Sequence, residues 1–216
     1  MTDIIIRNET PDDYRKVENI TREAFWNVYE PGCLEHYLLN KMRLSPDFIP
    51  ELDIVAEFEG QIVGNAACAK SHIEGDDNRR HPTITLGPIS VLPAFQHKGI
   101  GRRMIGHITD AAGRMGYEAI VLCGDPLLYS GYGFVAAERY GIRTSDNKFF
   151  PALHVYPLNG TDLTTCSGRY IESSIYETDP EQAESFDRYF PAKEKIADTP
   201  TQLRFREIMD MVGEDL

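Results

Sequence analysis

The chain has 216 residues, of which 42% are hydrophobic and 26% are charged, the composition of an ordinary globular protein. Such a composition excludes a disordered or collagen-like chain. No stretch approaches the ~18 consecutive apolar residues that a membrane span needs. The apolar residues 4–6 are too few for the core of a signal peptide, so we expect a cytoplasmic protein with no membrane partner.

The charge is acidic overall and unevenly distributed. Lys and Arg number 22 against 34 Asp and Glu, a net charge of -12, which disfavours nucleic acid as a partner. Residues 1–60 and 172–216 each carry a net charge of -7, whereas residues 61–171 carry +2. The middle of the chain is therefore the part suited to a phosphate-bearing ligand. The acidic flanks favour a cationic partner, or serve only to keep the protein soluble.

The cysteines and histidines show no metal-ligand spacing. The six histidines form no H-E-x-x-H pattern, and the cysteines form no C-x-x-C pair, so we expect no metal site. Widely spaced cysteines of this kind are typical of thiols in a reducing compartment. They are Cys33, Cys68, Cys123 and Cys166.

The first third of the chain predicts one strand, two helices and a hairpin. Thr10 is expected to cap the first helix, because proline and acids follow it directly. Apolar residues recur at helical spacing in both helices and concentrate in both arms of the hairpin. The expected elements are a strand at 4–7, helices at 10–28 and 34–44, and strands at 53–58 and 62–69.

The rest of the chain predicts a strand, a long helix and a buried strand, followed by shorter elements. Residues 99–115 form the clearest helix, with an apolar stripe at steps of three and four. The continuous apolar run 119–123 is typical of a central strand. The other expected elements are strands at 83–92, 134–137, 152–156 and 169–175, and helices at 125–129, 180–189 and 201–212. This order predicts an α+β or mixed α/β fold on one central sheet.

The loop between the strand 83–92 and the long helix has the chemistry of an anion site. Backbone N–H groups in the first turn of a helix have no internal partner, and the helix dipole adds positive charge there. Gly99 and Gly101 let the backbone approach an anion, and Lys98, Arg102 and Arg103 add charge. We therefore expect a pyrophosphate site. The Walker pattern is absent, and the dinucleotide pattern G-x-G-x-x-G fails at its third glycine.

Three motifs in this region resemble one enzyme family. Gln96-x-x-Gly99-x-Gly101 resembles the signature of the GCN5-related N-acetyltransferases (GNAT), which use acetyl-coenzyme A. Val91-Leu92-Pro93 is similar to that family's exit from the preceding strand. Tyr129-x-x-x-Gly133-Phe134 is similar to its element after the following strand.

The resemblance covers roughly residues 4–157. It implies a central mixed, mostly antiparallel sheet flanked by helices, with a GNAT domain at 1–157. The acidic extension, residues 158–216, would pack on the same domain. The extension has three alternative roles, which are to cover a sheet edge, to form a homodimer contact, or to build one wall of the acceptor site. We favour the last of these.

The resemblance also implies where acetyl-coenzyme A binds. The pantetheine arm would pair with the backbone of Ile89 and Val91, in a gap opened by a β-bulge. An N–H near Val91 or Leu92 would polarise the thioester carbonyl. Backbone N–H groups from 96 to 102 would hold the pyrophosphate. The implied cofactor-binding residues are Ile89, Ser90, Val91, Gln96, His97, Lys98, Gly99, Ile100, Gly101 and Arg102.

Tyr129 is the implied general acid, which protonates the leaving thiolate. A phenol of pKa about 10 donates to a thiolate whose conjugate thiol is near 8.5 only if the site favours the transfer. The alternative is a packing tyrosine, and Tyr132, its rival, is expected in the core. The family's asparagine seven residues earlier is Leu122 here. This shorter form resembles a bacterial subgroup called YhbS-like, and it puts the asparagine's cofactor contact in doubt.

The general base is left open by the sequence. Glu57, His72 and Glu74 lie on strands that could line the acceptor cleft, and a water chain is the alternative. Cys123 ends an apolar strand, so we expect a buried structural thiol rather than a nucleophile.

The function implied is transfer of an acetyl group from acetyl-coenzyme A to an amine, by direct attack in a ternary complex. The acceptor would be a small-molecule or peptide amine, and the acidic flanks weakly favour a cationic one. The alternatives are a non-catalytic acyl-coenzyme A-binding regulatory module and, less favoured, a nucleotide binder.

Overall fold

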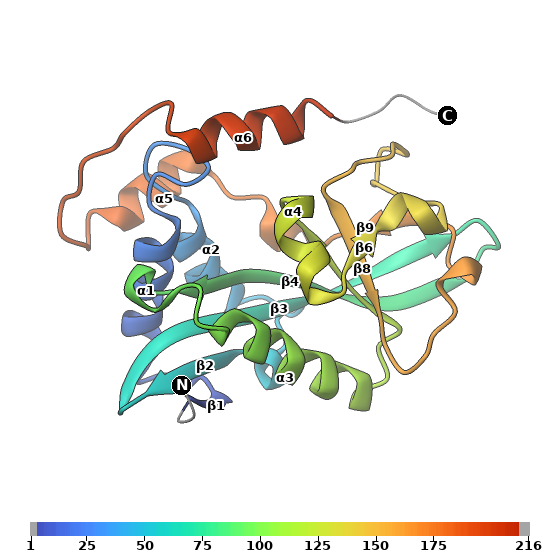
Figure 1. The fold of residues 1–216 in the computed structure, drawn as a ribbon, viewed down its shortest axis with the longest axis horizontal. Coiled ribbons are helices and arrows are strands. Elements are labelled where there is room, and N and C mark those ends of the chain that lie inside the picture. Colours follow the sequence, from blue (N-terminus) through green and yellow to red (C-terminus); the bar gives the residue numbers. More distant parts are fainter. Residues whose placement is uncertain (1–3, 212–216) are drawn as a thin grey trace.

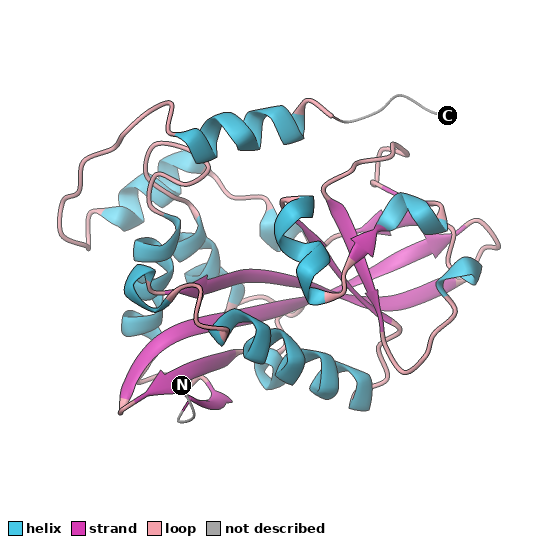
Figure 2. Ribbon diagram, in the orientation of Figure 1, coloured by secondary structure: helices cyan, strands magenta, loops and turns pink. Residues whose placement is uncertain are grey.

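A computed structural model describes residues 4–211, in which a nine-stranded mixed sheet forms the centre (Figures 1 and 2). The strand order is β1-β2-β3-β4-β5-β8-β6, and β9 pairs with β3 and β7. Pairing is antiparallel except between β4 and β5 and between β7 and β9, which confirms the mixed, mostly antiparallel sheet. The strands are β1 (Ile4–Asn8), β2 (Ile54–Phe58), β3 (Gln61–Gly75), β4 (Arg80–Val91), β5 (Ala119–Cys123), β6 (Val135–Ala136), β7 (Ile142–Arg143), β8 (Leu153–Pro157) and β9 (Gly168–Ile171).

The helices lie on both faces of the sheet. Side chains alternate across each strand, so Ile54 and Ala56 of β2 join the core under α3, whereas Val55 joins the core under α1 and α2. The apolar stripe of α3, exemplified by Met104 and Ile108, is completely buried there. The helices are α1 (Tyr14–Phe25), α2 (Glu35–Met42), α3 (Ile100–Arg114), α4 (Pro126–Tyr129), α5 (Pro180–Asp187) and α6 (Pro200–Met209).

The strands β4 and β5 pair for only three residues and then part. Residues 83–85 of β4 pair with residues 119–121 of β5, and β4 then continues from Leu86 to Val91 without β5 as a partner. A β-bulge lies in β4 at this point, because Ala66 and Cys68 of β3 oppose Ile89 and Leu86. The bulge expected near Ile89 is therefore present. It bends β4 away and leaves one backbone edge of the strand free.

The chain after residue 157 completes the same sheet. β9 pairs antiparallel with residues 72–75 at the far end of β3. Beyond β9, α5 docks on α1 through Arg22, whose buried guanidinium bonds both carboxylate oxygens of Asp187 at 2.5 and 3.1 Å. α6 then crosses the top of the molecule above α4 (Figure 1). The extension thus packs on the domain, and β9 is part of the domain's own sheet.

Several element boundaries differ from those expected. The first helix begins at Tyr14, because Asp13 and Thr10 close a turn before it and the Thr10 hydroxyl bonds Asp13 instead of capping the helix. The strand expected at 62–69 runs on to Gly75 in β3, and β4 already begins at Arg80, so a short turn joins the two strands. The strands expected at 134–137 and 169–175 shorten to β6 and β9, and β7 was not expected.

Two further points concern the helices. The helix expected at 201–212 ends at Met209, and position 212 of the expected range lies outside the described residues. Within residues 4–211, no helix combines the length and the apolar character that crossing a membrane requires.

Candidate active site

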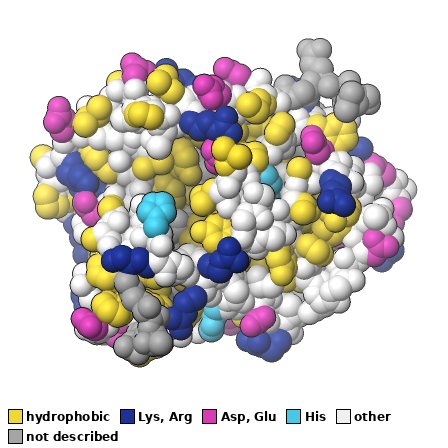
Figure 3. Space-filling model, in the orientation of Figure 1, with side chains coloured by type: hydrophobic (Ala, Val, Ile, Leu, Met, Phe, Trp, Pro, Cys, Tyr) yellow, Lys and Arg dark blue, Asp and Glu magenta, His cyan; other side chains and the backbone are white. Residues whose placement is uncertain are grey.

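A cleft of about 310 Å³ occupies the space where β4 and β5 part. It is bounded by the free edge of β4, the N-terminus of α3, α4, and the last turn of α1 with the loop after it. In Figure 3, hydrophobic side chains gather in a strip through the middle of this face, with Lys and Arg side chains around it. The cleft residues used below are Val28, Tyr29, Ile89, Val91, Gln96, His97, Gly99, Ile100, Gly101, Leu128, Tyr129 and Tyr132.

The free edge of β4 presents the backbone of alternate residues to the cleft. The Leu92 N–H donates to the Val63 carbonyl of β3 at 2.9 Å, so Leu92 and Ser90 turn their backbone toward β3. Ile89 and Val91 consequently turn theirs to the cleft. The Leu92 N–H is engaged and cannot be an oxyanion donor, which leaves Val91 for that role.

Ser90 does not line the cleft. Its side chain is buried on the opposite face of β4, where its hydroxyl lies 3.2 Å from that of Thr21 on α1. The expected contact of Ser90 with a cofactor is therefore not supported by its position. Gln96 lies at the mouth of the cleft, and its side-chain amide donates to the Val91 carbonyl at 3.1 Å.

The loop before α3 forms a cradle of free backbone donors. His97 and Gly99 have positive φ angles of 59° and 82°, which turn successive N–H groups toward one side. Gly99 is the N-cap of α3, and no side chain of the described residues caps the helix. Within residues 4–211, no acceptor bonds the N–H groups from His97 to Arg102, whereas the Gln96 N–H already donates to Pro93. The cradle therefore suits an anion, with Gln96 outside its set of donors.

The cationic side chains of this region all bond backbone carbonyls. Lys98 Nζ donates to Ala94 at 2.8 Å, and Arg102 Nη2 donates to Gly131 at 2.7 Å. Arg103 is turned away from the cradle and donates to Ile4 of β1. Arg102 also lies over the Tyr132 ring, 5.3 Å from its centroid. It thereby ties the segment after α4 to the start of α3.

Tyr129 reaches the cleft from the end of α4. Asp125 caps this short helix by accepting from the Leu127 N–H at 2.9 Å. Within residues 4–211 no group bonds the Tyr129 hydroxyl, so its proton is free to be donated. Desolvation, with a smaller effect of Tyr29, raises the pKa of Tyr129 above its usual value of 10 and keeps the phenol protonated.

Tyr132 also lines the cleft, with a half-buried side chain whose ring lies 6.3 Å from that of Tyr129. Tyr132 packs against the core as expected, and it also faces the cleft, which was not expected. The glycines around it form a short turn that carries the ring outward.

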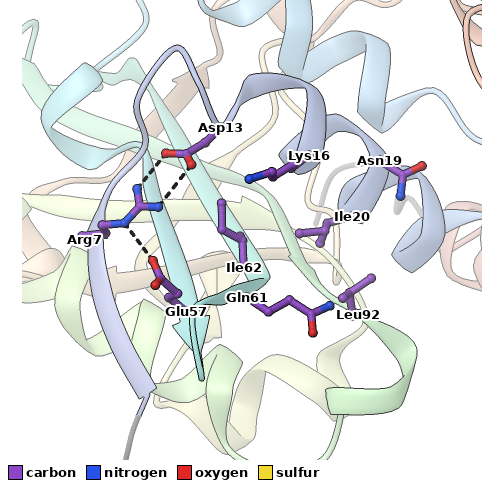
Figure 4. A pocket seen from close by; sticks show the side chains of 10 residues that line it. Arg7, Asp13, Lys16, Asn19, Ile20, Glu57, Gln61, Ile62 and Leu92 are labelled. Atoms are coloured by element: carbon purple, nitrogen blue, oxygen red, sulfur yellow. Dashed lines mark hydrogen bonds and ion pairs between the residues drawn. The ribbon is translucent and has the colours of Figure 1, made fainter.

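The three candidate bases from the sequence lie away from the cleft. Glu57 bonds Arg7 at 3.1 Å and lines a separate hollow of about 440 Å³ beside α1 (Figure 4). His72 and Glu74 lie at the opposite end of β3, where Arg169 bonds Glu74 at 2.7 Å. None of the three therefore lines the cleft described here, because strand position alone did not show which end of the sheet opens.

The structure instead brings Glu172 close to the point where β4 and β5 part. Its carboxylate accepts from the Tyr170 hydroxyl at 3.3 Å, and that hydroxyl lies 2.5 Å from Thr85 Oγ1 on the last paired residue of β4. Desolvation raises the pKa of Glu172 to about 7, although part of the side chain still reaches solvent. Glu172 is thus poised to exchange a proton near neutral pH. Local sequence gave no signal of this, because the position depends on the pairing of β9.

Cys123 is not buried, contrary to expectation. Its exposed side chain lines a second cavity, on the other side of α4. Desolvation, with a smaller effect of Glu172, raises the pKa of the thiol to about 12. The thiol therefore stays protonated at neutral pH and is a poor nucleophile.

One cluster with potential metal ligands lies far along the sheet from the cleft. Atoms of His81, Glu118 and Cys166 lie within 4.8 Å of one another. The close pair is His81 Nδ1 and Glu118 Oε2, which are 2.8 Å apart and form a hydrogen bond. That bond holds the His81 and Glu118 side chains together.

Comparison with known proteins agrees with this geometry. The sequence model of the acetyltransferase (GNAT) domain family matches residues 51–136, which include the free edge of β4, the cradle and Tyr129. This match shows that residues 51–136 resemble the GNAT domain, and the described residues have the GNAT fold.

The chain is similar to the uncharacterized N-acetyltransferase YhbS of Escherichia coli K12. It is 28% identical over 141 residues, which cover 65% of this chain and 78% of YhbS. The crystal structure of E. coli YhbS in complex with CoA superimposes with a TM-score of 0.70 at 24% identity, covering 82% of this chain and 96% of that one. A Brucella melitensis GNAT acetyltransferase in complex with acetyl-CoA gives 0.64 at 24% identity, covering 82% and 99%. At this identity the superpositions establish the fold.

Proposed function

We propose that this protein transfers an acetyl group from acetyl-coenzyme A to the amine of an acceptor by direct attack in a ternary complex. The observation that carries the proposal is the uncapped cradle from His97 to Arg102, which adjoins the free edge of β4 and the unbonded hydroxyl of Tyr129. An anion site, a strand-like edge and a proton donor around one cleft are what this reaction would need, and the residues that line the cleft support that reading.

The donor would lie along the cleft with its two polar parts on backbone groups. The pyrophosphate would accept from the N–H groups of the cradle, where the dipole of α3 adds positive charge. The pantetheine amides would pair with Ile89 and Val91 as an added strand would. The Val91 N–H would then polarise the thioester carbonyl. The solved complexes of two GNAT proteins of this fold with CoA and with acetyl-CoA support the choice of donor.

The chemistry requires one base and one acid. An alkyl ammonium of pKa about 10 must lose a proton before its nitrogen can attack. Glu172, with its carboxyl pKa raised to about 7, would accept that proton directly or through a water. The new C–N bond forms as the C–S bond breaks, and Tyr129 gives its proton to the leaving thiolate. The nitrogen loses its second proton as it becomes an amide, and that proton passes through water to restore the phenol.

The same arrangement favours catalysis over a non-catalytic module. A protein that only senses acyl-coenzyme A needs the cradle and the β4 edge, and it has no use for an unbonded phenol in the cleft. Cys123 gives no support to a covalent intermediate, because its thiol stays protonated. Direct attack therefore explains more of the site than a non-catalytic binding module or a covalent intermediate on Cys123 would.

Calorimetric titration with acetyl-coenzyme A, with NADH as the control ligand, tests the proposal. We expect saturable binding of acetyl-coenzyme A alone. Gly101→Asp would place a carboxylate in the cradle, where a Cβ atom would stand 3.9 Å from the Tyr132 hydroxyl, and should weaken binding at least ~100-fold by repelling the pyrophosphate. Gly106→Asp, on an exposed position of the same helix, is the matched control and should bind normally. Unchanged binding by Gly101→Asp, or equal binding of NADH, would contradict the proposal.

A further inference from the structure

A second cavity of about 450 Å³, here named the α6 pocket, adjoins the cofactor cleft. It is enclosed by α4, the ends of β5 and β8, and the inner face of α6. Its wall includes Phe150, Phe205 and Ile208, and the Phe205 ring packs on Tyr29 with centroids 4.9 Å apart. The pocket is therefore mainly apolar, and its outer wall comes from the last part of the chain.

We infer that the α6 pocket binds the acceptor and selects amines that carry an apolar body. This inference rests on the proposed transfer of an acetyl group and adds the class of acceptor to it.

The position of the pocket supports this role. Val28, Tyr29 and Leu128 line both the α6 pocket and the cofactor cleft, so the two spaces are adjacent, and Tyr129 lines the cleft beside this shared wall. An acceptor held in the pocket would reach the thioester at the point where the leaving sulfur needs its proton. An acetyl group has only two carbon atoms and fits within the cofactor cleft. The donor therefore does not need the α6 pocket, which is left for the acceptor.

The charges around the pocket argue against a polycationic acceptor. Among the described residues, the only acid in its wall is Asp125, which caps α4 and bonds the Arg204 side chain of α6 at 3.1 Å. An ammonium group in the pocket would have to compete with that guanidinium. The expectation that the acidic flanks attract a cationic acceptor therefore loses its support at this site.

The acids of the extension are used elsewhere. Asp179 caps α5, Asp187 bonds Arg22, and Glu184 pairs with Lys195. These contacts hold the extension together and fix it to α1. These three acids of the extension therefore serve folding contacts rather than a ligand.

α6 is anchored firmly enough to act as a wall. The Thr199 hydroxyl and the Gln202 side-chain amide both donate to the Asn27 carbonyl, at 3.0 and 3.2 Å. Arg204 adds its bond to Asp125. The helix is therefore tied at its N-terminus to the loop after α1 and in its middle to α4.

The test compares two amines of equal length, heptan-1-amine and hexane-1,6-diamine, which differ by a terminal methyl against a second ammonium. Both are titrated by calorimetry with and without saturating coenzyme A, so that no turnover occurs. We expect heptan-1-amine to bind at least ~10-fold more tightly, because an apolar wall leaves the second ammonium without a partner. Equal or tighter binding of the diamine would overturn the inference.

Two variants of α6 locate the binding. Phe205→Ala removes part of the wall and should weaken the binding of heptan-1-amine about 10-fold while leaving the affinity for coenzyme A unchanged. Leu203→Ala, on the exposed side of the same helix, is the matched control and should change neither. Equal amine binding by wild type and Phe205→Ala would contradict the inference.

A final comparison separates this inference from the proposed function. If octanoyl-coenzyme A binds more tightly than acetyl-coenzyme A, and Phe205→Ala removes the gain, the pocket holds an acyl chain and the acceptor assignment is wrong. If acetyl-coenzyme A fails to bind, the proposed function fails, whereas the amine titrations without coenzyme A still report on the pocket.

Discussion

The Tyr129 ring lies directly against Gly124, so closely that a methyl group on Gly124 would stand 2.2 Å from Tyr129 Cε2 and 2.7 Å from Cδ2. No side chain can occupy position 124 while the ring stays in place. Gly124→Ala should therefore move the phenol out of line, and misplacement of a reacting group by ~1 Å costs about 100-fold in turnover. Steady-state kinetics with acetyl-coenzyme A would measure this as a lower kcat with unchanged cofactor affinity.

Gly106→Ala is the control for that substitution. Gly106 lies on the exposed side of α3, where a methyl group would meet no other atom of the described residues within 4 Å. Alanine there should stabilise the helix by about 0.5–1 kcal/mol. Its turnover should match the wild type. A normal kcat for Gly124→Ala would mean that the position of the Tyr129 ring does not limit the reaction.

Tyr129→Phe tests the acid itself. It removes one oxygen and keeps the packing of the ring on Phe134, whose centroid is 6.0 Å away. We expect kcat to fall about 10²- to 10⁴-fold, the usual contribution of a general acid, with little change in the Kd for acetyl-coenzyme A. Tyr132→Phe, on the neighbouring ring of the same cleft, should keep most of the activity. Should the two variants behave in the opposite way, Tyr132 would be the acid.

The pH profile tests Glu172 as the base. A carboxyl whose pKa is raised to about 7 is deprotonated above that pH, so kcat/KM should rise through a limb with its midpoint near 7. Glu172→Gln should lower kcat/KM and abolish this limb. Glu138→Gln, on an exposed glutamate elsewhere, should leave the profile unchanged. A limb that persists in Glu172→Gln would assign the titration to another group.

The parts of the site that the sequence predicted are those built from neighbouring residues. The cradle follows from a strand end, Gly99 and Gly101, and a helix start within a few residues, so its donors could be placed before the structure was known. The free edge of β4 was also expected. The sequence did not predict which residues of this edge face the cleft, because the bulge sets that register. Val91 faces the cleft, whereas the Ser90 side chain lies on the other face, near Thr21.

The parts that the sequence did not predict depend on contacts between distant segments. Glu172 comes near the cleft only because β9 pairs with β3, about a hundred residues earlier in the chain. The α6 pocket requires α6 to dock on α4 through Arg204 and Asp125. Cys123 looked buried because its strand is apolar throughout, yet its side chain faces the space that α6 leaves open. The spacing of apolar residues in the sequence indicates whether a segment is a helix or a strand. It carries no information on which distant segments pack together.

The ion pair between Arg22 and Asp187 should be the main electrostatic contact that holds α5. The Arg22 side chain is only 1% exposed, and both oxygens of Asp187 bond it. Asp187→Asn keeps the shape of the side chain and leaves the buried guanidinium without a counter-charge. The free energy of unfolding, measured by urea denaturation, should therefore fall by about 3–5 kcal/mol. Asp198→Asn removes the partner of Arg206 in a pair whose side chains are 56% (Arg206) and 70% (Asp198) exposed. The free energy of unfolding should fall by less than about 1 kcal/mol. Equal losses would show that burial does not set the strength of the first pair.

His36 beside this pair predicts how stability depends on pH. Its ring is fully buried, Nε2 lies 3.1 Å from Asp187 Oδ1, and desolvation lowers its pKa from 6.5 to about 4. Between these values the unfolded chain binds a proton that the folded protein does not, so the free energy of unfolding should fall as the pH drops from about 6.5 to about 4. Urea denaturation at a series of pH values would show this slope. His36→Gln, which cannot titrate, should flatten it, and a slope that survives in that variant would assign the effect to the carboxylates.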